Sequence, residues 1–142
     1  MGRFLTELEV RELQDGRHQL LSPLIYESST VGIIIVPTGF ITNYASIPRL
    51  PIVYLLFGGL GKREATLHDW LYTGEHNTGT GLVVNRSTAD KVLRGARYSC
   101  DIQIMQEYES ISVKKILNNT WALISAWLWW FGVRLLGARH WE

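Results

Sequence analysis

The sequence has little cysteine and little net charge, and each shortage excludes a class of function. Its 142 residues include one cysteine, Cys100, so it can form neither an intrachain disulfide nor a zinc site built from clustered cysteines. Lysine and arginine number 14 against 13 aspartates and glutamates, which leaves a formal net charge of +1. This balance gives no bulk electrostatic case for a nucleic-acid partner or for an anionic membrane.

The sequence also lacks an apolar run long enough to cross a bilayer. The run Trp121–Val133 has thirteen residues without a charge, whereas a transmembrane helix needs about 20. It carries four of the six tryptophans. Three alternatives stay open for this helix: a buried core element, which the short run favours, a helix inserted into or lying on a membrane, and an oligomer interface. The charged start, Met1–Glu12, predicts no signal peptide.

Composition and patterning predict one folded α+β domain over residues 1–142. Hydrophobic residues make up 46% and charged residues 19%, a balance typical of a chain that buries a core. Short alternating or apolar runs separated by turn residues predict an antiparallel β meander in the first third. The expected strands lie at Glu7–Arg11, His18–Leu21, Leu24–Tyr26 and Val31–Val36, and the β-branched last run is expected to be a central strand.

Three helices are expected after the meander. The first covers Ala65–Tyr72, the second about Thr88–Tyr98, and the third, which is rich in tryptophan, about Val113–Leu136. Ser87 is placed to cap the second helix, with Asp90 three residues on at the capping-box position. We expect the first two helices to face one another and the third to pack behind them.

The most informative stretch for function is His68–Tyr72. On a helix, His68 and Tyr72 share a face and Asp69 lies about 100° away. A histidine can take a proton from water near neutral pH when a carboxylate holds its other nitrogen, and Asp90 on the facing helix could supply it. The alternatives are structural: His68 and Asp90 would tie two helices together, Tyr72 would belong to the core, Asp69 would favour a helix N-terminus, and Asp90 would complete a cap.

Five motifs run from the middle to the end of the chain. They read Val-Pro-x-Gly-Phe at Val36–Phe40, Thr-x-x-Ala-Ser-Ile-Pro-Arg at Thr42–Arg49, His-Asp-x-Leu-Tyr at His68–Tyr72, Arg-x-x-Ala-Asp at Arg86–Asp90 and Val-Arg-Leu-x-Gly at Val133–Gly137. Together they resemble a phage and prophage family known as domain of unknown function 1353. The resemblance implies a location in the host cytoplasm or in the virion, but no activity. The chain departs from the family at Asn43, where an aspartate is usual.

A more distant resemblance implies a chemistry. A glycine-rich loop, then His-Asp-x-x-Tyr on one helix and Ala-Asp on a second, is similar to the calcium-dependent phospholipases of the A-two class, above all to the disulfide-free version in parvovirus capsid proteins. The resemblance implies that Asp69 and the carbonyl groups of Gly58, Gly59 and Gly61 hold Ca²⁺. It also implies that His68 activates water while Tyr72 and Asp90 orient the histidine.

The segment Asn43–Arg49 supplies the residues expected to contact a substrate. Arg49 can bind a phosphate or carboxylate group, or can pair with an acid of the fold. Ser46 and Asn43 are the other two candidates. Ser46 lacks the surroundings of a nucleophile elbow and can equally be a loop or capping residue. Arg134, a charge within an apolar helix, must reach solvent or a partner acid.

These features leave three hypotheses for the function. The first is a small phage-encoded hydrolase of an ester or phosphoester, with a centre formed by His68, Asp69 and Asp90 and with calcium as cofactor. The second is a non-enzymatic virion or host-takeover protein that binds a phage or host partner, which exposed tryptophans on the last helix would favour. The third is a protein that captures or degrades a small nucleotide signal through Arg49, His68 and the loop Thr73–Asn85.

Overall fold

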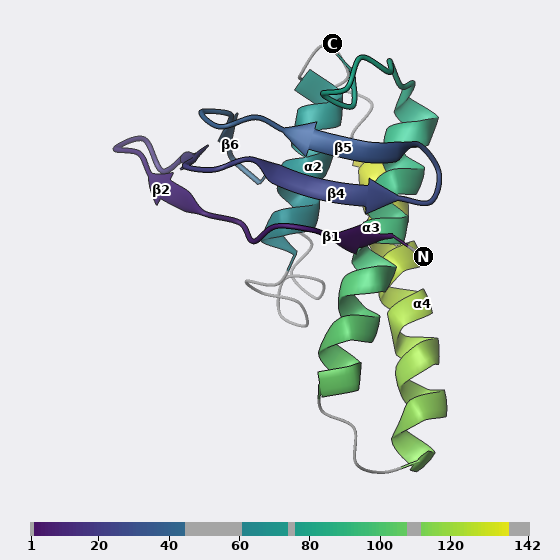
Figure 1. Cartoon of the computed structure of the whole chain (residues 1–142). Coiled ribbons are helices and arrows are strands. Elements are labelled where there is room, and N and C mark those ends of the chain that lie inside the picture. Colours follow the sequence, from purple (N-terminus) through teal and green to yellow (C-terminus); the bar gives the residue numbers. More distant parts are fainter. Residues whose placement is uncertain (1, 45–60, 74–75, 108–111, 137–142) are drawn as a thin grey trace.

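The computed structural model describes residues 2–44, 61–73, 76–107 and 112–136 (Figure 1). Short strands fill the N-terminal part, and three helices follow. The strands are β1 (Arg3–Phe4), β2 (Val10–Glu12), β3 (His18–Leu20), β4 (Leu24–Ser28), β5 (Gly32–Val36) and β6 (Ile41–Thr42), and the helices are α2 (Lys62–Thr73), α3 (Arg86–Glu107) and α4 (Ser112–Leu136). The expected α+β class is therefore confirmed.

The strands divide between two antiparallel sheets instead of following one another in a single meander. One sheet has the order β1-β4-β5 and the other the order β2-β3-β6. The run Val31–Val36 forms strand β5 as expected, but its expected central position is wrong, because β4 occupies the middle of the described sheet. The outer edge of β5 bonds to the connection between α2 and α3, in which the Thr78 carbonyl accepts the Ile35 N–H at 2.7 Å. This partly covered edge explains how a β-branched run is tolerated there.

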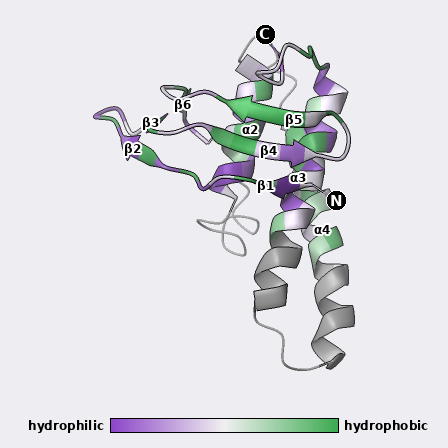
Figure 2. Cartoon of the chain, viewed as in Figure 1, coloured by the Kyte–Doolittle hydropathy of each residue, from purple (hydrophilic) through white to green (hydrophobic). Residues whose placement is uncertain are grey.

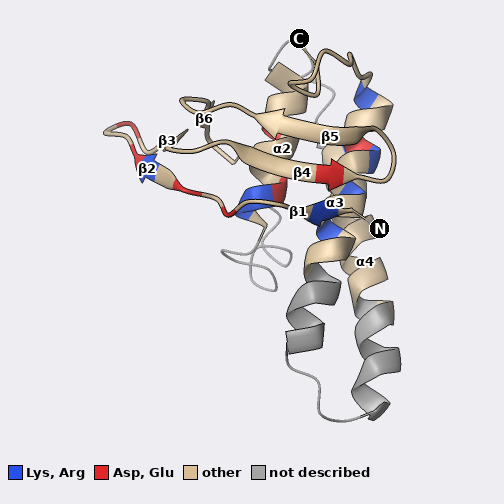
Figure 3. Cartoon of the chain, in the orientation of Figure 1, with Lys and Arg blue, Asp and Glu red and all other residues tan. Residues whose placement is uncertain are grey.

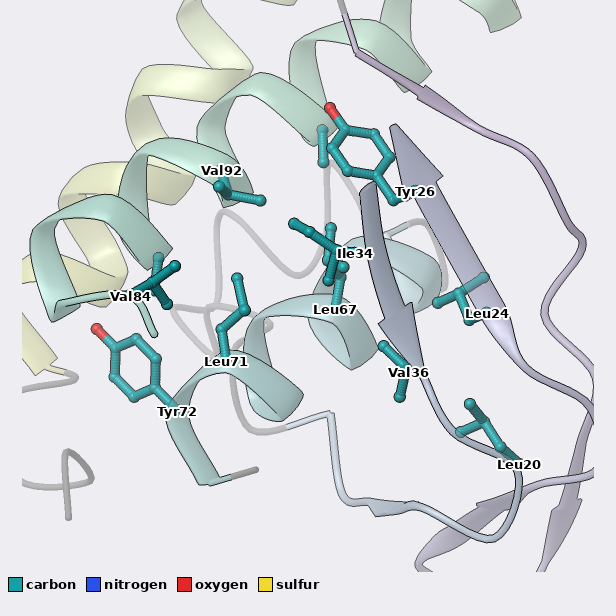
Figure 4. Close-up of a cluster of buried hydrophobic side chains, with 12 residues drawn as sticks. Leu20, Leu24, Tyr26, Ile34, Val36, Leu67, Leu71, Tyr72, Val84 and Val92 are labelled. Carbon is teal, nitrogen blue, oxygen red and sulfur yellow. The ribbon is translucent and has the colours of Figure 1, made fainter. Parts of the chain in front are cut away.

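The main core lies between the β1-β4-β5 sheet and helices α2 and α3 (Figure 4). Alternate residues of β4 and β5 face inward, and the pairs Leu24–Val36 and Tyr26–Ile34 lie directly opposite one another. This inward face is the reason that both strands are rich in hydrophobic residues (Figure 2). The buried cluster consists of Leu20, Leu24, Tyr26, Ile34, Val36, Leu67, Leu71, Tyr72, Val84, Ala89, Val92 and Ala96.

Helices α2 and α3 pack against one another as expected, and α4 packs mainly against α3, so that α3 lies between the other two (Figure 1). It begins one residue before the expected cap, and Ser87 is therefore not the N-cap. Instead, the Asn85 side-chain oxygen accepts the Thr88 N–H at 2.9 Å, which is the bond that defines an N-cap. Because the cap is Asn85, Asp90 is released from the capping-box role that the sequence also allowed.

The buried face of α4 combines small residues with one large aromatic residue. Its inner face carries Ala122, Ser125 and Ala126 together with the buried Trp129 and Val133. Leu93 of α3 completes a second, smaller apolar cluster with Trp129 and Val133. The Trp-rich helix is therefore buried on one face only. No helix in the described parts of the chain combines the length and the apolar character needed to cross a membrane.

Candidate functional site

The carboxylate of Asp90 is the meeting point of α2, α3 and α4, and it is fully buried. Its Oδ1 atom lies 3.1 Å from Nε2 of His68 and accepts the Tyr72 hydroxyl at 2.6 Å. Its Oδ2 atom accepts Nη1 of Arg134 at 3.4 Å. The expected meeting of His68, Tyr72 and Asp90 is thus present in the structure, and Arg134 reaches the partner acid that its position in an apolar helix required.

The helical spacing of α2 sets the geometry on the histidine side. His68 and Tyr72 are one turn apart, and their ring centroids lie 4.1 Å from each other. Both side chains therefore point from α2 toward the same carboxylate on α3. Arg86, at the start of α3, donates from Nε to the Tyr72 hydroxyl at 3.2 Å and from Nη2 to the Arg134 carbonyl at 2.8 Å. Arg86 therefore links the Tyr72 side chain to the backbone at the end of α4.

The network keeps Asp90 ionised. Burial alone would raise the pKa of this carboxyl, but the hydrogen bonds from His68, Tyr72 and Arg134 outweigh burial and hold the pKa below its usual range. The pKa of Tyr72 is raised, first by burial and then by its bond to Asp90. Tyr72 therefore acts as a neutral donor to a carboxylate, which is the arrangement that fixes a neighbouring imidazole.

The Asp69 side chain points toward the β2-β3-β6 sheet. Its Oδ2 atom accepts the Thr42 hydroxyl of β6 at 2.6 Å, and the same hydroxyl oxygen accepts the Tyr44 N–H at 3.0 Å. The adjacent Asn43 is exposed. The structure thus joins Asp69 to the strand that leads into the candidate substrate segment, while His68 faces α3. Ser46 and Arg49 lie outside the described residues.

The expected calcium site can be compared with the structure at only two of its four residues. Gly61 has φ +90°, and a Cβ atom there would collide with the Trp129 ring. Its carbonyl accepts the Ala65 N–H at 2.9 Å. Close packing and the first turn of α2 therefore account for this glycine. Gly58 and Gly59 lie outside the described residues.

The described residues alone do not form a metal cage. No group of three or more His, Cys, Asp or Glu side chains converges in this part of the chain, and a calcium ion needs six to eight oxygen ligands, usually including several carboxylates. Asp69 is the single carboxylate among the residues expected to bind calcium. Calcium binding therefore stays a prediction.

A second buried polar cluster was not expected from the sequence. Arg97 of α3 places Nη1 3.3 Å from Oε1 of Glu64 on α2. Its Nε donates to Ser125 Oγ at 3.5 Å, and its guanidinium lies 5.3 Å from the centroid of the Trp129 ring. The spacing of these residues in the sequence could have indicated the pair. Glu64 is one turn before His68, and Arg97 is two turns after Asp90. The pairs His68–Asp90 and Glu64–Arg97 therefore follow one another along the seam, the contact line between the antiparallel helices α2 and α3.

A comparison with known protein families covers most of the chain. A family model described as "Protein of unknown function (DUF1353)" matches residues 18–133. The chain belongs to the DUF1353 family. The match begins at strand β3, upstream of the motifs from which the resemblance was inferred, and ends in α4. No curated protein and no solved structure shows a significant similarity to the chain.

In this DUF1353 protein, three of the five motifs that carry the resemblance meet at one carboxylate. His68 and Tyr72 come from the second half of α2, Arg86 and Asp90 from the first turn of α3, and Arg134 from the end of α4. The roles of Arg86 and of Thr42 were not recognised from the sequence, although both residues lie within the quoted motifs. The convergence identifies the Asp90 network as the most organised polar site in the described residues.

Proposed function

We propose that this DUF1353 protein is a hydrolase of an ester or phosphoester in which His68 is the general base and Asp90 orients it. The observation that carries the proposal is the shared Asp90 Oδ1 atom, which lies 3.1 Å from His68 Nε2 and accepts the Tyr72 hydroxyl at 2.6 Å. An ionised carboxylate can only accept hydrogen bonds, so Nε2 of a neutral His68 carries the proton and Nδ1 carries the lone pair. A lone pair held in this way is what a general base requires.

The proposed reaction is a direct attack of water on the substrate, with no covalent enzyme intermediate. His68 Nδ1 takes a proton from water as the water oxygen bonds to the carbonyl carbon or phosphorus of the substrate. The bond from that atom to the leaving oxygen then breaks, and the imidazolium returns its proton to the leaving alkoxide. The products are an acid and an alcohol. The negative charge of Asp90 stabilises the imidazolium that exists between the two proton transfers.

The test must separate a catalytic histidine from a structural one. The variant His68→Gln suits this purpose, because the glutamine amide can still donate to Asp90 but cannot take up a proton. We expect hydrolysis of p-nitrophenyl butyrate or of bis(p-nitrophenyl) phosphate by the wild type, and a rate loss of about 10²-fold or more in His68→Gln. The matched control is His18→Gln in β3, which should retain the wild-type rate.

Two results would contradict the proposal. One is full activity of His68→Gln toward the substrate that the wild type hydrolyses. The other is a wild type that hydrolyses neither probe. In addition, Asp90→Asn should lower the rate constant more than it lowers the fraction of folded protein, because an amide at this position can stabilise the wrong tautomer of His68.

A second candidate is a non-enzymatic protein that binds a phage or host partner. The supporting observation is that Trp127 and Phe131 on α4 are more than half exposed, at 51% and 57%, since monomeric soluble proteins rarely expose large contiguous apolar patches. Under this candidate, His68 and Asp90 form only a tie between helices. Substitution of His68 would then weaken partner binding only as far as it destabilises the fold, which the melting temperature reports. The wild type would hydrolyse neither probe.

A further inference from the structure

The outer face of α4 is apolar and open. Its large side chains, which we call the apolar ridge, are between 42% and 57% exposed. The ridge consists of Leu123, Ile124, Trp127, Leu128 and Phe131. With Thr120, these residues line an open groove of about 470 Å³. A surface helix normally turns its polar face to water, so the ridge is a face that another surface should cover.

Cations border the ridge. The guanidinium of Arg94 on α3 lies 4.5 Å from the centroid of the Trp127 ring and 5.9 Å from that of Trp130. Lys91 is exposed and precedes Arg94 by three residues, so it lies on the same side of α3. At the C-terminal end of the ridge, the Arg134 side chain is 44% exposed. The apolar face therefore has positive charge along one side and at one end.

Among the side chains that the structure describes, no exposed acid borders the ridge, and Arg134 at its end pairs with the buried Asp90. Where side chains are described, the exposed or half-exposed acids lie before residue 30, in the strands and their connections (Figure 3). The acids that the helices contribute there, Glu64, Asp69 and Asp90, are buried. Where their side chains are described, the helices thus present cations and apolar groups to solvent but no exposed acid, although the chain as a whole has a net charge of only +1.

We propose that the apolar ridge docks on an anionic lipid surface, with Leu123, Trp127 and Phe131 entering the headgroup and acyl boundary and Lys91 and Arg94 contacting the headgroups. Apolar side chains with large aromatic rings, flanked by cations, are the pattern of a helix that lies in a membrane interface. A protein partner would call for about one hydrogen bond per 100–200 Å² of interface. Among the side chains that the structure describes, Thr120 is the single hydroxyl, amide or charged group that lines the groove, so lipid fits this face better than a folded partner does.

The proposal can be tested by flotation of the full chain with vesicles. One set contains phosphatidylcholine and phosphatidylglycerol in equal amounts, and the other contains phosphatidylcholine alone. We expect the protein to float with the anionic vesicles, and we expect the bound fraction to fall as salt is added, because the cations are exposed to the screening ions. Vesicles with brominated acyl chains should quench tryptophan fluorescence, and Trp127→Phe should lose much of that quenching.

Surface variants identify the docking face. Trp127→Ser combined with Phe131→Ser should lower the partition coefficient roughly tenfold or more, and Arg94→Glu should lower it roughly tenfold. The matched controls are Leu82→Ser with Val83→Ser, which removes exposed apolar groups elsewhere, and Arg11→Glu in β2. Both controls should bind as the wild type does. All these positions are at least partly exposed, so the melting temperature should stay near the wild-type value.

Three results would overturn the proposal. The first is no flotation with either set of vesicles. The second is equal binding to both sets, which would remove the role of the cations. The third is a concentration-dependent dimer that Trp127→Ser dissociates, without vesicle binding, which would show that a second copy covers the ridge. The test uses no residue of the Asp90 network, so its outcome does not depend on the hydrolase proposal.

Discussion

Glu64 of α2 and Arg97 of α3 form an ion pair inside the helical layer, with Oε1 and Nη1 3.3 Å apart and both side chains at most 3% exposed. The pair lies beside the Asp90 network on the same seam between α2 and α3. Cys100 of α3 lies near this pair. Burial, and then the negative charge of Glu64, raise the pKa of the Cys100 thiol to about 12. The seam therefore holds two buried carboxylates, each matched to an arginine.

Removal of one partner of this pair should cost more stability than removal of both. Arg97→Met leaves a buried negative charge at Glu64 and should lower the free energy of unfolding by about 3–5 kcal/mol. The double variant Glu64→Gln with Arg97→Met should recover much of that loss, because no unpaired charge remains. Urea denaturation of the wild type, the two single variants and the double variant measures the coupling. Additive losses would show that the two side chains do not act as a pair.

The hydroxyl of Tyr72 should contribute measurably to stability. Tyr72→Phe removes one donor from the buried Asp90 carboxylate and should lower the free energy of unfolding by about 1–2 kcal/mol. Tyr44→Phe is the matched control, since the buried Tyr44 hydroxyl has no hydrogen-bond partner among the described residues. Its removal should be neutral or slightly stabilising. Equal losses in the two variants, measured by thermal or urea unfolding, would contradict the network.

The lowered pKa of Asp90 predicts how stability changes with acid. The folded pKa lies below the ordinary value of 3.8, so the folded chain holds the charged form more strongly than the unfolded chain does. This contribution is fully present above the unfolded pKa and is lost as the pH falls toward the folded pKa. The difference in unfolding free energy between the wild type and Asp90→Asn should therefore shrink between about pH 5 and pH 3.

Asp15 supplies the control for this pH dependence. Its pKa is also lowered, by hydrogen bonds from the backbone and side chain of Arg17, but the pair is exposed to solvent. The corresponding difference for Asp15→Asn should be much smaller at every pH, because water and salt screen surface pairs. A pH-independent difference for Asp90→Asn would show that Asp90 is not held as a carboxylate.

Calcium binding can be tested through the melting temperature. If Asp69 binds a calcium ion, calcium should raise the melting temperature of the wild type as the site fills. Asp69→Asn should lose this response, while Asp15→Asn should keep it. Magnesium serves as the ion control, because it requires a smaller and more regular coordination shell. A wild type that does not respond to calcium would contradict the expected calcium site and leave the His68–Asp90 pair as a metal-free centre.

Local patterns determined much of the fold before any tertiary contact was known. The apolar run Leu24–Tyr26 and the β-branched run Val31–Val36 located β4 and β5. Helical patterns located most of α2, the first half of α3 and nearly all of α4, whereas the part of α3 beyond Tyr98 was not expected. The partition of strands between two sheets did not follow, because pairing of β1 with β4 depends on contacts between distant residues. The cap of α3 was misplaced by two residues, since Ser87 and Asn85 are both good caps and only the helix start decides between them.

The sequence by itself determined which residues form the candidate site: the spacing of His68 and Tyr72 on one helix face, and the Ala-Asp motif on the next helix, were enough to predict their meeting at Asp90. Only the tertiary structure decided that Arg86 and Arg134 join them, that Asp69 turns to Thr42, and that Glu64 pairs with Arg97. It also decided where charge lies, because a net charge of +1 does not reveal that the helices bury their described acids together with Arg97, while Lys91 and Arg134 stay exposed. Periodicity is a local property of the chain, whereas the partner of a buried charge and the exposure of a helix face depend on how the helices pack together.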